Sequence, residues 1–299
     1  MDELPVIAIV GVTASGKSAA AVSLAQELGR PAEIINGDSM LVYRGMDIGT
    51  AKPGLAERGG VVHHLIDIMD VTESASVAQF QSLARAAIAD CRARGVTPIV
   101  VGGSALYVHA ILDQMDFPGT DPAVRAKWAA ELDRVGAPAL HEQLARQSPS
   151  AAAGILPGNG RRIVRALEVI EMTGSFTSRL PEPEYALEPV RQFGLGVPND
   201  VLDRRIAARV DIMWQAGFVE EVESLVQRGL RRGVTASRAL GYRQVLAYLE
   251  GECSLKQARE ATIVATRQFA RKQAGWFRRD HRIMWLPYDA PMLARRMSL

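Results

Sequence analysis

Residues 6–18 of this 299-residue chain read VIAIVGVTASGKS, an apolar run followed by the pattern G-x-x-x-x-G-K-S. The apolar run predicts a buried strand, and the segment from Ala19 to Leu28, with Gly29 after it, predicts a helix. A glycine-rich loop between a strand and a helix turns successive backbone N–H groups toward a phosphate. This stretch therefore predicts a protein that binds a diphosphate or a triphosphate.

Each part of the loop has a predicted task. Lys17 carries a charge that reaches across two phosphoryl groups, and Ser18 offers a hydroxyl to Mg²⁺. The N-terminus of the following helix adds a partial positive charge. The loop alone does not distinguish transfer, hydrolysis or expulsion of the phosphate. The predicted diphosphate-binding or nucleotide-binding residues are Gly11, Val12, Thr13, Ala14, Ser15, Gly16, Lys17 and Ser18.

The composition is that of an ordinary globular protein, with 48% hydrophobic and 23% charged residues. Apolar runs of membrane-spanning length are absent, and no signal-peptide pattern precedes the first strand, so we expect no membrane contact. Cys91 and Cys253 stand far apart without a C-x-x-C pair. This spacing argues against disulfide and zinc frameworks and favours the reducing cytoplasm.

Strands and helices alternate over the first 115 residues, which predicts a parallel sheet with ligands at the carboxyl ends of its strands. We therefore predict an α/β fold with a P-loop NTPase-like parallel sheet core, built from residues 1–115 and 198–299. Residues 116–197 are predicted to form a helical insertion domain. Its expected helices span 122–135, 137–147 and 161–173, and residues 190–197 form a strand that returns to the sheet. Later helices are expected at 200–216, 218–229, 237–250 and 255–279, and a last strand at 282–286.

Two polar residues follow predicted strands and are candidates for the chemistry. Asp38 comes after the strand 32–35 with Gly37 beside it, and is the best candidate for a general base. The alternative is an aspartate that orders a turn or holds water on Mg²⁺. Ser104 follows Gly102-Gly103, where backbone can approach a ligand, although it also suits the cap of the next helix. His63 and His64 point to opposite faces of a strand, so we interpret them as structural.

Positive charge is concentrated in the last third of the chain. Residues 199–299 hold 18 Lys/Arg against 11 Asp/Glu, a net charge of +7, whereas the whole chain carries only +2. Arg267, Arg271 and Arg278 fall on one side of a predicted helix, with Phe269, Ala270, Trp276 and Phe277 opposite. This side is either a solvated surface or a face for phosphates, which guanidinium groups suit.

These motifs together resemble the tRNA dimethylallyltransferase family, also called isopentenyl-tRNA or IPP transferases, over nearly the whole chain. The phosphate loop matches, and so do Asp38-Ser39 and the very specific block from Tyr43 to Pro53. Further matches are Val101-Gly102-Gly103-Ser104-Ala105-Leu106-Tyr107, Arg165-Ala166-Leu167-Glu168, Gly241-Tyr242-Arg243-Gln244 and Thr266-Arg267-Gln268.

The resemblance implies the reaction and its participants. The loop would bind dimethylallyl diphosphate with Mg²⁺, and pyrophosphate would leave. The acceptor would be the exocyclic N6 amine of the adenosine 3′-adjacent to the anticodon of tRNA. Asp38 would take the proton from that amine, Ser104 would hold Asp38 or the diphosphate, and Lys17 would act on the leaving group. We expect a monomer.

The resemblance also implies a set of contacts with the anticodon arm. They are Asp38, Ser39, Met40, Leu41, Ser104, Arg125, Arg161, Arg162, Arg165, Arg238, Gly241, Tyr242, Arg243, Arg267, Arg271, Lys272, Gln273 and Arg278. One departure concerns the diphosphate, because Asn199 stands where many members of the family have an arginine. Either Arg205 or Arg209 takes its place, or that contact is missing.

Three other functions use parts of the same pattern. A small-molecule or nucleotide kinase would use the loop on ATP, but does not explain the Tyr43–Pro53 block. A prenyltransferase acting on free AMP or ATP needs neither an insertion nor a basic last third. A non-enzymatic RNA-binding NTPase switch would not place a carboxylate and a hydroxyl beside the loop.

Overall fold

The computed structural model describes residues 3–298, which divide into two compact units. One unit holds the chain up to Gln114 and again from Glu184 onward, and the other spans Met115–Pro183. The second boundary lies earlier than the predicted position at 197. The reason is that the strand at 190–196 pairs with the central strand of the sheet and so belongs to the first unit.

A six-stranded, all-parallel sheet forms the centre of the first unit. Its strands are β1 (Val6–Val10), β2 (Ala32–Asn36), β3 (His63–His64), β4 (Thr97–Gly102), β5 (Val190–Gly196) and β6 (Ile283–Pro287). Their order across the sheet is β3-β2-β4-β1-β5-β6, so β1 and its phosphate loop lie inside the sheet. The predicted α/β fold with a parallel sheet is confirmed.

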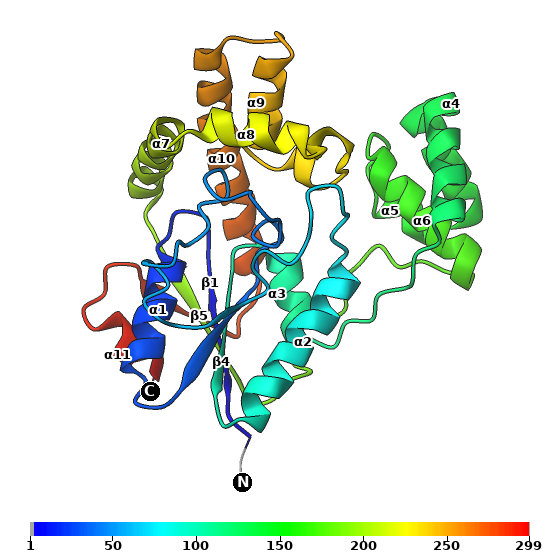
Figure 1. Cartoon of the computed structure of the whole chain (residues 1–299). Helices are drawn as coiled ribbons and strands as arrows, with labels where there is room; N and C mark the ends of the chain where they lie inside the picture. Colours follow the sequence, from blue (N-terminus) through cyan, green and yellow to red (C-terminus); the bar gives the residue numbers. More distant parts are fainter. Residues whose placement is uncertain (1–2, 299) are drawn as a thin grey trace. The chain divides into compact units, whose positions relative to one another are not determined.

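Helices cover both faces of this sheet, as its continuous apolar strands require. Ile7 and Ile9 of β1 pack with residues of α1 (Lys17–Glu27) and α11 (Leu293–Ser298). The alternate residues of β1 pack with those of α2 (Val77–Ala93) and α3 (Ala105–Leu112) on the other face (Figure 1). Because successive side chains of a strand point to opposite faces, β1 contributes residues to two separate hydrophobic cores.

Most of the last hundred residues form helices beyond one end of the sheet (Figure 1). They are α7 (Asn199–Gln215), α8 (Phe218–Gln227), α9 (Tyr242–Leu249) and α10 (Leu255–Phe277). Short 3₁₀ turns at Leu230–Arg232 and Ala236–Arg238 separate α8 from α9, so the single helix predicted over 237–250 is wrong at its start. Val12 and Ala14 of the phosphate loop pack against Leu202 and Ile206 of α7 and Ala270 of α10.

The predicted opposite faces of α10 are only partly correct. Ala270 and Phe277 are buried, as expected, but Phe269 is 39% exposed and Trp276 is 43% exposed. The buried stripe follows Ala258, Thr262, Ala270, Gln273 and Phe277. Because this stripe includes a polar residue, Gln273, hydrophobicity alone misplaces it.

The second unit is a small helical body. It contains α4 (Pro122–Gln147), α5 (Pro149–Ala153) and α6 (Gly160–Thr173) around its own apolar core. Gly136, with φ of +78°, interrupts α4 and makes it two helical segments, which confirms the predicted division at that residue. The short helix α5 was not predicted. In residues 3–298, no helix combines the length and the apolar character needed to cross a membrane.

The loop from Tyr43 to Pro53 is held by intramolecular contacts. The Lys52 side chain is 4% exposed, and its Nζ donates to the carboxylates of Asp47 (2.6 Å) and Asp67 (2.5 Å). It also donates to the Tyr43 carbonyl at 2.7 Å. The Glu221 carboxylate accepts from the backbone N–H groups of residues 47–49, at 2.6–3.3 Å. This block is therefore a structural unit of the fold.

Replacing Lys52 by methionine should destabilise the protein. Lys52→Met leaves two carboxylates and a carbonyl without their shared donor, which we expect to lower the free energy of unfolding by about 2 kcal/mol. Lys256→Met is the matched control. Lys256 is 82% exposed in its ion pair, so its replacement should lower the free energy of unfolding by less than about 0.5 kcal/mol. Urea denaturation of both variants measures the difference, and equal midpoints would contradict the structural role.

Candidate active site

Directly after β2, Gly37 lies against Gly102 at the carboxyl end of the neighbouring strand β4. A Cβ on Gly102 would lie 2.4 Å from the Gly37 carbonyl oxygen, and one on Gly37 would lie 3.2 Å from the Val101 carbonyl oxygen. Neither position therefore tolerates a side chain without movement of the backbone. Asp38 and Ser104 follow these glycines and line the same cavity.

This cavity has a volume of about 490 Å³ and lies within the first unit. The lining of the cavity includes Thr13 of the phosphate loop, Asp38 and Ser104. An apolar group comes from α7, α8 and α10, and a basic group includes Arg209, Arg238, Arg243 and Lys272. The apolar lining residues on these helices are Ile206, Val210, Met213, Phe218, Ala265 and Phe269, and Met40, Ala239 and Leu240 add to them from loops. One cavity thus combines a phosphate loop, a carboxylate, apolar walls and cationic side chains.

The phosphate loop has the backbone conformation that anion binding requires. Gly11 (φ +141°) and Gly16 (φ +95°) adopt positive φ values, and so does Ala14 (φ +60°). Ser15 is buried, and its hydroxyl has no hydrogen-bond partner among the described residues. Lys17 Nζ donates to the Val12 carbonyl at 2.6 Å, across the mouth of the loop. An unpaired hydroxyl and an ammonium bonded to backbone fit a loop shaped for an anionic ligand.

The electrostatics of the site favour an anion. Burial lowers the pKa of Lys17 to about 8, the nearby Asp38 carboxylate partly opposes this, and the Arg209 guanidinium adds to it. Burial also lowers the pKa of Arg209 from its ordinary value. Two cations held close together and out of water lose part of their hydration, which a bound diphosphate would replace.

The structure places Arg205 and Arg209, the two arginines considered in place of Asn199, in different surroundings. Arg205 lies over the ring of Tyr288, with 4.2 Å between the guanidinium carbon and the ring centroid. Arg209, one turn further along α7, lines the cavity instead. Of the two arginines, Arg209 is therefore the one that borders the cavity.

Asp38 is held by a local network that leaves one carboxylate oxygen available. Its Oδ1 accepts from the Met40 N–H at 2.9 Å, and its own N–H donates to Asn36 Oδ1 at 2.8 Å. Ser104 occupies the N-cap position of α3, but its side chain makes no capping hydrogen bond. Within residues 3–298 the Ser104 side chain therefore borders the cavity without capping α3, which weakens the capping alternative.

Two residues predicted to contact tRNA are buried. Tyr242 is 0% exposed and its hydroxyl donates to Glu221 Oε1 at 2.6 Å. Gln273 is 5% exposed and bonds to the phosphate loop rather than to solvent. This placement contradicts the predicted RNA contact of both side chains, because neither is accessible. Ser39, Met40 and Gly241 do line the cavity, whereas Leu41 is half-buried outside its lining.

The predicted basic face of α10 is divided between exposed and paired side chains. Arg271 donates to both carboxylate oxygens of Asp203, at 2.9 and 2.8 Å, and Arg267 donates to the Asp203 carbonyl at 3.2 Å. Lys272 and Arg278 are exposed. A polyanion therefore meets Lys272 and Arg278 directly, and meets Arg271 only in competition with Asp203.

In the second unit, the arginines predicted for RNA have different surroundings. The Glu168 carboxylate is fully buried and pairs with Arg125 (2.8 Å) and Arg165 (3.0 Å). Arg162 donates to the Ser178 carbonyl at 2.6 Å, and Arg161 is exposed. Arg125 and Arg165 thus have a structural task as partners of a buried charge, which the sequence did not reveal.

Comparisons with known proteins identify the family of this chain. The sequence model of the IPP transferase family matches residues 41–280. The chain belongs to the IPP transferase family. A tRNA dimethylallyltransferase of Thermobifida fusca is 59% identical, over 97% of this chain and 92% of that protein. These matches favour the predicted prenyltransferase over the kinase alternative.

Solved structures of IPP transferases share the fold. A full-length tRNA isopentenylpyrophosphate transferase from Bacillus halodurans has a TM-score of 0.71 and 40% identity, with 98% of this chain and 93% of that chain covered. A eukaryotic dimethylallyltransferase, studied in the act of modifying tRNA, has a TM-score of 0.81 and 26% identity, with 95% and 74% covered.

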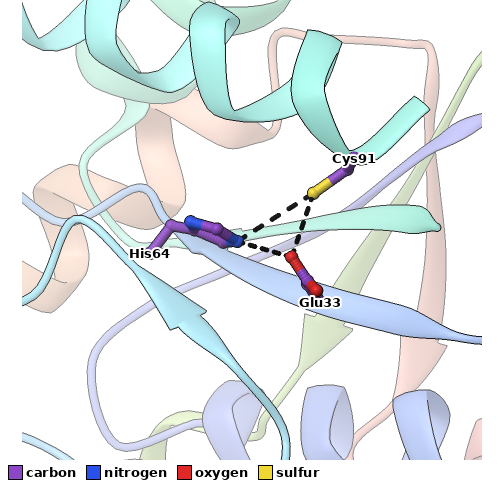
Figure 2. A group of neighbouring side chains, drawn as sticks. All are labelled: Glu33, His64 and Cys91. Carbon is purple, nitrogen blue, oxygen red and sulfur yellow. Dashed lines mark hydrogen bonds and ion pairs between the residues drawn. The ribbon is translucent and has the colours of Figure 1, made fainter. Parts of the chain in front are cut away.

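A second polar cluster in this IPP transferase has the residue types of a metal site. Donor atoms of Glu33, His64 and Cys91 lie within 4.8 Å of one another (Figure 2). Glu33 Oε2 accepts from His64 Nε2 at 2.7 Å and from the Cys91 thiol at 3.4 Å. Arg94 donates to both Glu33 oxygens, at 2.8 and 2.6 Å.

The surroundings of this cluster oppose a metal ion. Burial, with the hydrogen bond to Glu33 after it, raises the pKa of the Cys91 thiol to about 12, so the thiolate ligand is disfavoured. Arg94 already occupies the Glu33 carboxylate, and a cation would have to displace it. The cluster instead joins β2, β3 and α2, which agrees with the structural interpretation of His64.

The cluster should make the protein sensitive to acid. Hydrogen bonds from Arg94, and secondarily from His64, lower the pKa of Glu33 from 4.5 to about 2. A carboxyl group whose pKa is depressed by folding contributes stability above pH 4.5 and loses it as the pH falls toward 2. Glu33→Gln should therefore unfold more easily than wild type at pH 7, and the difference should shrink below pH 4. Thermal melts from pH 7 to 2.5 test this, with exposed Glu27→Gln as the control; a constant difference would contradict it.

Proposed function

We propose that this protein transfers a dimethylallyl group from dimethylallyl diphosphate to the exocyclic N6 amine of the adenosine 3′-adjacent to the anticodon in tRNA. Pyrophosphate is the second product. One observation carries the proposal: in a member of the IPP transferase family, the phosphate loop, the Asp38 carboxylate and an apolar wall border a single cavity of about 490 Å³.

The diphosphate end of the substrate has a matching set of cations. Departure of pyrophosphate from an allylic carbon places negative charge on the leaving oxygen, while resonance stabilises the carbon. Lys17, Arg209 and the backbone N–H groups of the loop would neutralise that charge. Because these groups are already in place, little reorganisation accompanies the bond cleavage.

The five-carbon chain would lie against the apolar wall. Ile206 and Val210 project from α7, and Met213 from its next turn. Side chains of this kind exclude water from the allylic carbon, which protects the reactive group from hydrolysis. The nucleophile is then the adenine amine rather than water.

Asp38 is suited to take the proton from that amine. It lies at the edge of the cavity, with one oxygen bonded to the Met40 N–H and the other available. An aromatic amine is a weak nucleophile, so removal of its proton by a nearby carboxylate assists the attack. The adenosine has to leave its base stack to reach this position. Arg238, Arg243 and Lys272 provide positive charge in the same lining.

Mg²⁺ fits the donors near the loop. Ser18 carries its hydroxyl at the start of α1, directly after the phosphate loop, and an oxygen donor of this kind is one that Mg²⁺ prefers. The ion would supply further charge neutralisation to the diphosphate. We propose that the protein acts as a monomer in the cytoplasm, where its tRNA substrate occurs.

A substrate survey tests the proposal. Labelled dimethylallyl diphosphate is incubated separately with tRNA, AMP and ATP, and γ-labelled ATP is incubated with tRNA. The proposal expects label only on tRNA that has adenosine 3′ of the anticodon. Label on AMP or ATP would indicate the free-nucleotide prenyltransferase, and transfer of the γ-phosphate would indicate a kinase.

Replacing Asp38 by asparagine should affect chemistry more than binding. Asp38→Asn keeps the size of the side chain and the bond to Met40, but removes the base, so single-turnover rates should fall about 100-fold. The affinity for tRNA should stay within a few-fold of wild type. Asp289→Asn, an exposed position after β6, is the control. A wild-type rate in Asp38→Asn would exclude Asp38 as the base.

The exposed end of α10 should control the salt dependence of tRNA binding. Arg278→Ala removes one cation, so binding should weaken by about 1 kcal/mol, and the slope of log K against log[salt] should flatten by about 0.7 to 0.9. Dimethylallyl diphosphate binding should not change. Arg296→Ala is the control, because Arg296 is exposed on α11, which packs with α1 on one face of the sheet. Equal slopes for both variants would mean that this face of α10 does not contact RNA.

A further inference from the structure

The phosphate loop is bonded to a side chain that lies 260 residues away in the sequence. Gln273, on the buried stripe of α10, accepts a hydrogen bond from the Thr13 N–H at its Oε1, at 2.9 Å. Its Nε2 donates to the Gly103 carbonyl at 2.7 Å. One amide thus connects the first turn of the phosphate loop with the turn that precedes Ser104.

The local packing is specific for this amide. A Cβ on Gly103 would lie 2.6 Å from Gln273 Nε2, 3.2 Å from the Gly11 carbonyl oxygen and 3.5 Å from Lys17 Nζ. Gly103 therefore permits the close approach of these three groups beside the phosphate loop. Gln273 is 5% exposed and both ends of its amide are satisfied, so it has neither solvent nor another ligand to bind.

We propose that Gln273 is a positioning residue of the transferase site, one that sets the separation between the phosphate loop and the turn that carries Ser104. A primary amide suits this task because it accepts on one side and donates on the other. The backbone N–H of Thr13 and the carbonyl of Gly103 are the complementary pair. The proposal rests on the proposed function only for the identity of the diphosphate.

The position of Gln273 on α10 gives this contact a second consequence. Its neighbour Lys272 is exposed and lines the cavity, and α10 also carries Arg278 at its end. The helix that offers cations to a polyanion is therefore bonded through Gln273 to the loop that binds diphosphate. A shift of α10 along its axis would move Thr13 with it.

Three variants test the positioning role. Gln273→Met keeps the length of the side chain but loses both hydrogen bonds. Gln273→Glu keeps the acceptor for the Thr13 N–H and loses the donor to Gly103. Gly103→Ala disturbs the same contact from the other side and leaves Gln273 unchanged. Gln79→Met, at an exposed position on α2, controls for the substitution itself.

Misplacement of reacting groups by small distances lowers rates strongly, so kcat/KM for dimethylallyl diphosphate should fall about 10- to 100-fold in all three variants. The affinity for tRNA should stay within about twofold of wild type in each. Hydrogen–deuterium exchange of the peptide covering residues 11–18, measured without substrate, should be faster in Gln273→Met than in wild type. Melting temperatures show whether each variant is folded at the assay temperature.

The outcomes are distinct. If Gln273 only fills space, Gln273→Met and Gln273→Glu will match Gln79→Met in kcat/KM and in exchange, and the proposal is overturned. If Gln273→Met does not fold, Gly103→Ala decides, since wild-type kcat/KM in that variant would overturn the proposal as well. Failure of the wild-type protein to modify tRNA would reject the proposed function, while the exchange measurement would still decide the role of Gln273 in the loop.

Discussion

At Gly37 and Gly102 the backbones of β2 and β4 come so close that a Cβ on Gly102 would lie 2.4 Å from the Gly37 carbonyl oxygen. Here the absence of side chains lets Asp38 and Ser104 border one cavity, next to the loop after β1. Gly103 allows a similar close contact with α10, because the absence of a Cβ leaves room for the Gln273 amide. The site therefore depends on backbone contacts that only glycine allows.

The elements that the sequence predicts well are those that local patterns determine. The apolar strands, the phosphate loop and the break at Gly136 each depend on a few adjacent residues. Features that depend on distant partners are harder to predict: β3 is only two residues long and is defined by its pairing with β2. The exposed Phe269 and the buried Gln273 of α10 belong to the same class. There, burial follows what the helix packs against rather than the polarity of its side chains.

The candidate site shows the same division between local and distant information. The sequence motif predicts the phosphate loop, and its position after a strand predicts Asp38. In the structure, Asp38 and the loop residue Thr13 border one cavity with Ser104. The arginines are harder to interpret, because a guanidinium binds a carboxylate with the same geometry as a phosphate. Arg165 pairs with Glu168 three residues along the predicted helix, a spacing that the sequence could have indicated, whereas nothing in the sequence indicates that Arg125 pairs with Glu168 43 residues away. Similarity to a family identifies important positions, whereas only the structure separates those that bind from those that support.

Asp203 has a consequence for how quickly a bound polyanion leaves. Its carboxylate holds Arg271, and its backbone carbonyl holds Arg267, in the absence of any ligand. An RNA phosphate that takes either guanidinium must displace these oxygens, and the oxygens recapture the guanidinium as soon as the phosphate moves away. Part of the attraction would therefore be returned on dissociation, which would shorten the residence time of any RNA bound through these two arginines. An enzyme that must process many copies of the same nucleic acid benefits from such internal competition, since turnover requires release as much as it requires capture.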